Sequence, residues 1–200
     1  YGKASDNNGG AFFVSSFGSK LYMKRSIVRY CEAVGNARGG AVYAENGGVL
    51  VMEYSTLASN KAKFGGAVSA DSGAKITLIA GTTSYVQGNT AASEGGGFDL
   101  AGAGTHLDVS GKDTKLVVKD NTATADGGGL FVIFAAAITV SDGAQMNVTK
   151  NTADEKAGGF YVWNARLDVV GKDTKLFIVE NVANRDGGGA WVVNSAVFSI

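Results

Sequence analysis

The chain of 200 residues contains no proline, one cysteine and one histidine, and its 18 basic residues balance its 18 acidic residues. Without proline, and without a Gly-X-Y period, collagen-like and polyproline structures are excluded. The single cysteine, Cys31, excludes a disulfide framework within these residues, and its apolar neighbours predict an inert buried thiol. Because the chain has no net charge, we expect no nucleic-acid partner.

Long hydrophobic runs are also absent. No apolar stretch approaches the roughly 18 residues that a membrane span requires, so we expect no direct membrane insertion within this segment. The chain begins without Met or a signal peptide and ends inside a strand-like run. We therefore expect residues 1–200 to be a single segment taken from a longer polypeptide.

The chain is instead rich in glycine, with 30 residues, and much of it lies in recurring pairs. Residues 105–132 and 165–192 align without gaps and share Gly-Lys-Asp-Thr-Lys-Leu and Asp-Gly-Gly-Gly, which indicates internal duplication. The pairs recur seven times at steps of 26 to 32 residues and begin at Gly9, Gly39, Gly65, Gly96, Gly128, Gly158 and Gly188.

Each unit contains three short strand-like runs separated by turn residues. In the fifth unit these are residues 130–134, 138–141 and 145–149. No run has the length or period of a helix. The pattern predicts an all-β fold, a right-handed parallel β-helix of about seven rungs of roughly 30 residues, with handedness taken from the crossover rule.

An Asn-x-Ala element precedes most of the glycine pairs. Equivalent asparagines on neighbouring rungs would hydrogen-bond to each other and to the turn backbone, and this structural ladder is favoured over a ligand-binding row. The predicted ladder consists of Asn60, Asn89, Asn121, Asn151 and Asn181.

The motifs resemble those of one protein family. Gly-Gly-Ala-Val at 39–42 and 65–68, Gly-Gly-Ala-Phe at 9–12 and the apolar-x-x-Asn element are similar to the repeats of chlamydial polymorphic outer-membrane proteins. The sequence departs from them by placing Leu, Val or Ile before the Asn, and by using Gly-Gly-Gly in later units. The resemblance implies the surface-exposed β-helical passenger of an autotransporter, used in adhesion.

Candidates for chemistry are few. His106 is the one possible imidazole base, and Asp108 and Asp168 would lie two rungs apart, about 9.6 Å by rung spacing, near the upper limit for inverting glycosidases. The alternative is solvated charge on an outer face. Cysteine and histidine do not cluster as metal ligands do. We predict a protein that is not an enzyme, with no catalytic residue, no metal site and no cofactor.

One glycosylation sequon occurs, at Asn147-Val148-Thr149. Alternation along the strand predicts that Asn147 points outward while its neighbours Met146 and Val148 point inward. Asn147 is therefore a possible glycosylation site, conditional on a eukaryotic secretory route.

The strand after each glycine pair has two alternating rows of side chains. The charge of Asp99 indicates which row faces outward. The predicted inward row is Ala41, Ala67, Phe98, Leu130, Phe160 and Ala190. The predicted outward row is Val42, Val68, Asp99, Phe131, Tyr161 and Trp191, followed two residues later by Ala44, Ala70, Ala101, Ile133, Trp163 and Val193.

This assignment predicts an exposed apolar patch on the last three rungs, of the kind that marks an interface. Two alternatives remain, that other parts of the chain cover the patch or that the face is inverted there. The candidate interface residues are Phe131, Ile133, Tyr161, Trp163, Trp191 and Val193.

The sequence favours a non-catalytic structural or scaffold element of an extracellular or cell-surface protein or fibre. Its aromatic face would bind a protein partner or mediate self-association. The first alternative is an adhesin, the passenger of an autotransporter, that binds a host or neighbouring surface. The second is a carbohydrate-active β-helix enzyme, since that fold also supports such chemistry.

Overall fold

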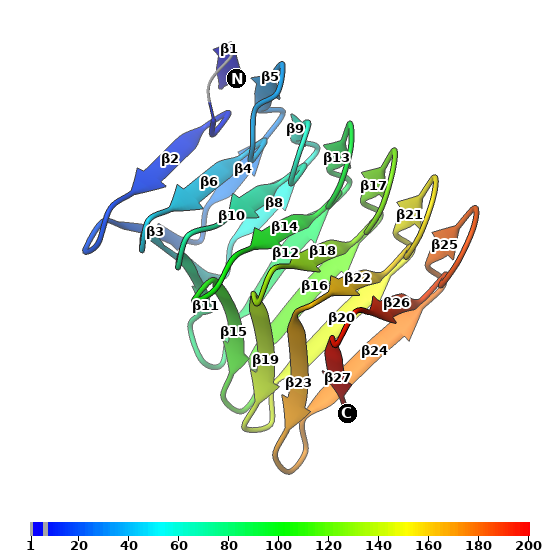
Figure 1. Cartoon of the computed structure of the whole chain (residues 1–200). Helices are drawn as coiled ribbons and strands as arrows, with labels where there is room; N and C mark the ends of the chain where they lie inside the picture. The colour runs from blue at the N-terminus through cyan, green and yellow to red at the C-terminus, as the bar shows by residue number, and fades with distance from the viewer. Residues whose placement is uncertain (1, 6–7) are drawn as a thin grey trace.

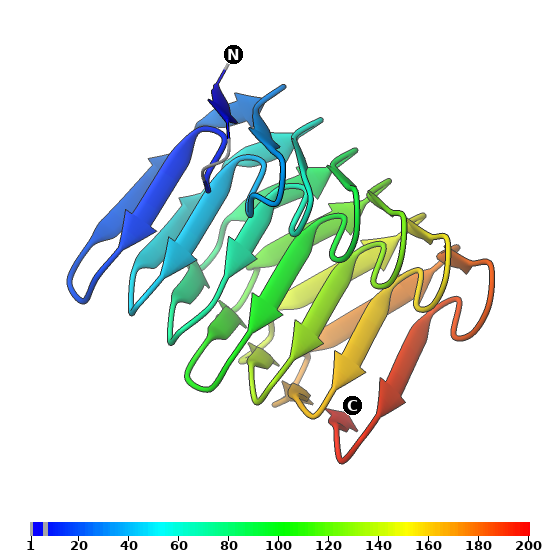
Figure 2. The ribbon, with the colours of Figure 1, turned by 45° about the horizontal axis from the view of Figure 1, so that its top comes forward.

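The computed structural model describes residues 2–5 and 8–200, which wind into stacked coils (Figure 1). Each coil passes in turn through four parallel sheets, here named A to D. Sheets A, B and C contain seven strands and sheet D contains six. The chain is therefore an all-β parallel solenoid, as its repeats predict. Figure 2 shows from a second direction how each coil lies beside the next along the whole chain. The described part of the chain holds no helix, and hence none suited to crossing a membrane.

Sheets A and B are formed by the segments on either side of the glycine pairs. Sheet A contains β1 (Lys3–Ser5), β5 (Glu32–Val34), β9 (Lys61–Ala62), β13 (Thr90–Ala91), β17 (Thr122–Ala123), β21 (Thr152–Ala153) and β25 (Val182–Ala183). Sheet B contains β2 (Phe12–Ser15), β6 (Val42–Glu45), β10 (Val68–Ala70), β14 (Phe98–Ala101), β18 (Leu130–Ile133), β22 (Phe160–Trp163) and β26 (Ala190–Val193).

Sheets C and D complete each coil. Sheet C contains β3 (Lys20–Lys24), β7 (Val49–Glu53), β11 (Lys75–Leu78), β15 (His106–Ser110), β19 (Ala137–Ser141), β23 (Arg166–Val170) and β27 (Val197–Ser199). Sheet D contains β4 (Ile27–Arg29), β8 (Thr56–Ala58), β12 (Thr83–Gln87), β16 (Lys115–Lys119), β20 (Gln145–Thr149) and β24 (Lys175–Val179).

The fourth strand of each coil departs from the three-strand unit that the sequence predicts. Sheet A consists mostly of two-residue strands directly after the asparagines, where we expected turn. Thr122 pairs with Thr90 on one side and with Thr152 on the other. Two residues carry too little periodicity to be recognised as a strand. They form one because the neighbouring coils present the same short segment in register.

The core fills the space between the sheets. Strand β20 shows the pattern, because Met146 and Val148 are fully buried while the alternate side chains are half-exposed. The same cluster of buried apolar side chains extends from Val14 to Leu167. Cys31 is also buried, as its apolar surroundings predict. Branched and aromatic residues dominate because they pack well on a pleated surface.

Glycine is required at the entry to sheet B because successive coils touch there through backbone. A Cβ atom on Gly96 would lie 2.3 Å from the carbonyl oxygen of Gly128. A Cβ on Gly128 would in turn lie 2.4 Å from the carbonyl oxygen of Thr152. Real Cβ contacts are never this short, so any side chain would force adjacent coils apart.

The asparagines before sheet A form a continuous hydrogen-bonded column. The Asn121 Nδ2 donates to Asn151 Oδ1 at 2.9 Å and to the Val86 carbonyl oxygen at 3.0 Å. Its Oδ1 accepts from the backbone nitrogen of Asn89 at 3.0 Å and from Asn89 Nδ2 at 2.9 Å. Asn60 and Asn181 continue the same pattern. Each amide therefore satisfies buried backbone groups that the turn would leave unpaired.

We expect Gly128→Ala to lower the free energy of unfolding by roughly 3 kcal/mol or more, because its Cβ meets backbone that cannot move aside. Gly188→Ala is the matched control. There a Cβ meets only the Asn181 carbonyl oxygen, at 3.1 Å, and should cost about 1 kcal/mol or less. Urea unfolding followed by circular dichroism measures both. Equal destabilisation by the two variants would contradict the stacking explanation.

We expect Asn121→Leu to cost roughly 2 kcal/mol or more, because it removes the side-chain oxygen that accepts from the buried backbone nitrogen and the side-chain Nδ2 of Asn89. Asn147→Leu should change stability by only about 0.5 kcal/mol, since Asn147 is half-exposed and its side chain bonds, among the described residues, to Gln145 alone. Thermal unfolding compares them. A similar midpoint for both variants would show that the ladder contributes little.

Candidate functional site

The outer side of sheet B contains most of the partly exposed aromatic side chains of the C-terminal coils. In β18 and β22 the alternate residues Leu130, Val132, Phe160 and Val162 are fully buried. The residues between them therefore point outward. Strand pairing places one outward residue of each coil in a column of Phe13, Tyr43, Ser69, Asp99, Phe131, Tyr161 and Trp191.

The outward row predicted for the earlier coils was wrong by one residue. Val42 pairs with Val68, Val68 pairs with Phe98, and both valines are fully buried. Ala44 and Ala70 lie in the column of Leu100 and are buried as well.

The cause is the number of glycines in each unit. A Cβ on Gly40 or Gly66 would meet the carbonyl oxygen of Gly66 or Gly96 respectively. Gly96 is therefore the equivalent of the second glycine in the earlier pairs, whereas we took it as the first. The extra glycine, Gly97, stands where the earlier coils carry Ala67, and the strand after it is correctly assigned.

Stacked rings continue along this column in the last three coils. The ring centroids of Phe131 and Tyr161 are 4.6 Å apart, and those of Tyr161 and Trp191 are 4.8 Å apart. The Tyr161 ring therefore has another ring on each of its two faces. The Lys156 Nζ lies 4.5 Å from the Trp191 ring centroid, a cation–π contact.

A second aromatic pair lies beside this stack. Phe134 packs edge-on against Trp163, with the ring centroids 4.8 Å apart, and is 52% exposed. The strand predicted over residues 130–134 ends at Ile133, and Phe134 has a φ of 55° in the following turn. Strand alternation therefore gave no signal that Phe134 belongs to this surface. We name the aromatic face as Phe131, Ile133, Phe134, Tyr161, Trp163, Trp191 and Val193.

A hollow of about 320 Å³ adjoins the aromatic face on its N-terminal side. We call it the acidic pocket. The lining residues are Arg38, Phe64, Asp71, Glu94, Asp99 and Ala101, together with Phe131, Ile133 and Phe134 of the aromatic face.

The most deeply placed group in the acidic pocket is the Asp99 carboxyl. Its Oδ2 accepts from the Ser69 hydroxyl at 2.8 Å and from Arg38 Nη1 at 3.0 Å. Arg38 also lies over the Phe64 ring, 5.0 Å from the centroid. Burial raises the pKa of Asp99 to about 6, the positive charge of Arg38 and the Ser69 hydrogen bond oppose this, and Glu94 adds to it.

Carboxylates continue along the neighbouring coils. The Tyr43 hydroxyl lies 2.8 Å from both Asp71 Oδ2 and Glu45 Oε2. Burial and these two carboxylates raise the pKa of Tyr43 well above its ordinary value. This side of sheet B therefore carries stacked aromatic rings at both ends, Phe13 with Tyr43 in the first coils and Phe131 to Trp191 in the last, with acidic side chains between them.

The residues considered for catalysis lie on sheet C, away from this surface. Asp108 and Asp168 occupy one column, separated by Thr139. Asp168 Oδ2 accepts from Arg166 Nε, while Asp168 Oδ1 is buried and has no hydrogen-bond partner among the residues that the structure describes. Asp108 accepts from the Ser110 hydroxyl at 3.2 Å. Within residues 2–5 and 8–200, no three or more acidic, histidine or cysteine side chains gather as metal ligands would.

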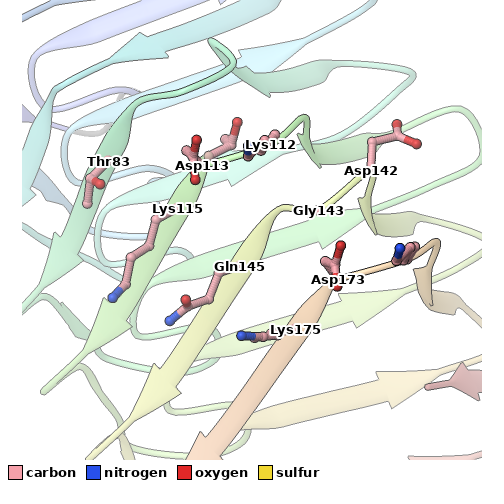
Figure 3. Close-up of a pocket in the computed structure, with 11 residues that line it drawn as sticks. Thr83, Lys112, Asp113, Lys115, Asp142, Gly143, Gln145, Asp173 and Lys175 are labelled. Carbon is pink, nitrogen blue, oxygen red and sulfur yellow. The ribbon is translucent and has the colours of Figure 1, made fainter.

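Another hollow, of about 580 Å³, lies on sheet D and the loops that lead into it. Lys115, Gln145 and Lys175 stand on three neighbouring strands, with Asp113 and Asp173 on the loops above them (Figure 3). The duplicated Gly-Lys-Asp-Thr loops flank the shorter turn of the coil between them, which accounts for the depression. It is exposed and lined by both charges.

Asn147 lies in β20, on the outer side of sheet D, as alternation predicts. Its Oδ1 accepts from Gln145 Nε2 at 2.6 Å, and its strand neighbours are Val117 and Phe177. Its role as a glycosylation acceptor remains a prediction. Comparisons with protein-family models, curated proteins and solved structures gave no match.

The raised pKa of Asp99 predicts a pH-dependent stability. The native state binds a proton more tightly than the unfolded chain does, whose carboxyl has the ordinary pKa of 3.8. The free energy of unfolding should therefore fall as pH rises from about 4 to about 6, by up to roughly 3 kcal/mol from this group. Arg38, Asp71 and Glu94 are the charged residues that face Asp99.

Asp99→Asn should flatten that part of the pH profile. Asp113→Asn, on an exposed loop, should leave it as in the parent chain. Urea unfolding at pH 4, 5, 6 and 7 measures the difference. An unchanged slope in Asp99→Asn would mean that Asp99 titrates normally.

Proposed function

We propose that this chain is a rigid, non-catalytic scaffold element that presents the aromatic face to a protein partner. The observation that carries the proposal is the aromatic face itself. Both tryptophans of the chain lie in this face, and they stand beside Tyr161 and Phe134 on the outside of a well-packed solenoid. The core does not require them there, since the inward row of the same strands is already apolar.

Two physical arguments support a protein as the partner. Trp and Tyr are the residues most enriched at binding hot spots, and contiguous exposed apolar surface on a soluble fold usually marks an interface. Phe131 and Trp191 cover the two faces of the Tyr161 ring, and a ring face is what a sugar would stack against. The ring edges suit packing against the apolar side chains of another protein.

We place the protein outside the cell or at a cell surface. The support is the resemblance of its Gly-Gly-Ala units to the repeats of chlamydial polymorphic outer-membrane proteins. In this setting the solenoid holds the aromatic face at a fixed distance from its attachment point. The partner belongs to the same assembly, in the manner of a fibre or surface-layer component.

A selection experiment tests the proposed function. A random-peptide display library is selected against the chain and counter-selected against the double variant Tyr161→Asp and Trp163→Asp. We expect peptides that bind the parent chain and lose at least about tenfold in affinity for the variant, because the charges disrupt the apolar contact. Circular dichroism should show the same β-structure in both.

The matched control is Tyr85→Asp and Phe177→Asp, which alters outward aromatic residues of sheet D that are 39% and 42% exposed. Peptides from the selection should bind this variant as they bind the parent. If every selected peptide binds independently of Tyr161 and Trp163, the aromatic face is not a protein-contact surface and the proposed function is wrong.

A further inference from the structure

The acidic pocket is lined by three carboxylates and one basic side chain, and a second cation, Lys63 Nζ, lies 5.1 Å from the centroid of the Phe64 ring in its wall. Asp71, Glu94 and Asp99 line it, and Arg38 is the one basic residue that does. Arg38 is committed to Asp99 at 3.0 Å and to the Phe64 ring. In the part of the chain that the structure describes, the Glu94 carboxylate has no hydrogen bond or ion pair.

The buried carboxyl of Asp99 is only partly satisfied. Ser69 and Arg38 both donate to Oδ2, and no donor within residues 2–5 and 8–200 bonds to Oδ1. Asp99 is 3% exposed and lines the pocket. A carboxylate oxygen in this position favours a donor that enters with its own positive charge, because a charge-assisted hydrogen bond compensates for desolvation.

The walls of the pocket define the shape of that donor. Phe64, Phe131, Ile133 and Phe134 provide apolar surface beside the carboxylates. A bare metal ion would leave this apolar surface uncovered. A neutral polar group would leave the excess negative charge of the pocket uncompensated. A lysine or arginine side chain satisfies both conditions, because its methylene stem packs on apolar surface while its head group reaches the carboxylates and the rings.

We infer that the acidic pocket receives a lysine or arginine side chain of the protein partner that binds the aromatic face. The inference rests on the proposed function and adds the chemistry of the partner. The pocket and the aromatic face share Phe131, Ile133 and Phe134. A single extended segment can therefore lay apolar side chains over Tyr161 and Trp163 and place a basic side chain in the pocket.

Hexa-arginine is the probe, and its uncharged isostere hexa-citrulline is the matched ligand. Because both tryptophans of the chain lie on the aromatic face, their fluorescence reports on binding there. We expect saturable binding of hexa-arginine at 150 mM NaCl and binding of hexa-citrulline that is at least about tenfold weaker. Equal affinities for the two peptides would overturn the inference.

The carboxylates are tested with variants of equal charge change. Asp71→Asn with Glu94→Gln should weaken hexa-arginine binding by at least about tenfold. Asp113→Asn with Asp173→Asn removes the same charge from exposed loops and should weaken it by less than about twofold. If both pairs weaken binding equally, the attraction is long-range and the pocket is not the site.

Two further measurements keep the outcome clear. Glu94→Gln alone removes a half-exposed carboxylate that makes no hydrogen bond in the described residues, so it tests the pocket if the double variant is unstable. If calcium chloride displaces hexa-arginine, and if this displacement requires the same carboxylates, the pocket is a metal-cation site and the inference is overturned. If display selection yields peptides that require Tyr161 but hexa-arginine does not bind, the inference fails while the proposed function stands.

Discussion

Hydrogen bonding from each coil to the next is the constraint on which the rest of this structure depends. It extends beyond the strands into the turns, where Gly39 N donates to the Phe64 carbonyl at 2.9 Å and Gly40 N to the Gly65 carbonyl at 3.1 Å. Parallel strands bonded in this way lie about 4.8 Å apart, so every residue rests on its equivalent in the neighbouring coil. A residue type persists in a column only if it tolerates a copy of itself at that distance.

That constraint restricts the residue types at some positions of each coil and leaves the outer positions free to vary. Glycine occupies the column where the backbones of adjacent coils touch. Asparagine occupies the column where the turn would leave buried backbone amides unpaired. Aliphatic residues fill the interior. The outer positions are free of these demands, and on sheet B polar Ser69 and Asp99 separate the aromatic residues of the first coils from those of the last. The stacking that builds the scaffold also brings these side chains close together.

The sequence predicts the parts of the structure that recur and misses the parts that do not. The asparagine and glycine columns were visible because each coil repeats the same demand, and the outward direction of Phe131 and Tyr161 followed from alternation anchored on Asp99. The two-residue strands of sheet A were missed because they are stabilised by neighbouring coils rather than by local pattern. The ion pair of Arg38 with Asp99 joins residues 61 positions apart, and no repeat indicates it.

The direction of the hydrogen bonds has a mechanical consequence. The bonds that join one coil to the next run along the length of the solenoid, so tension applied between its ends acts on a whole inter-coil contact at once. When such a contact breaks, one coil of roughly 30 residues unravels and releases about 100 Å of slack chain before the next is loaded. A solenoid of this kind resists extension up to a threshold and then lengthens in equal steps, which limits the force that reaches whatever it is attached to.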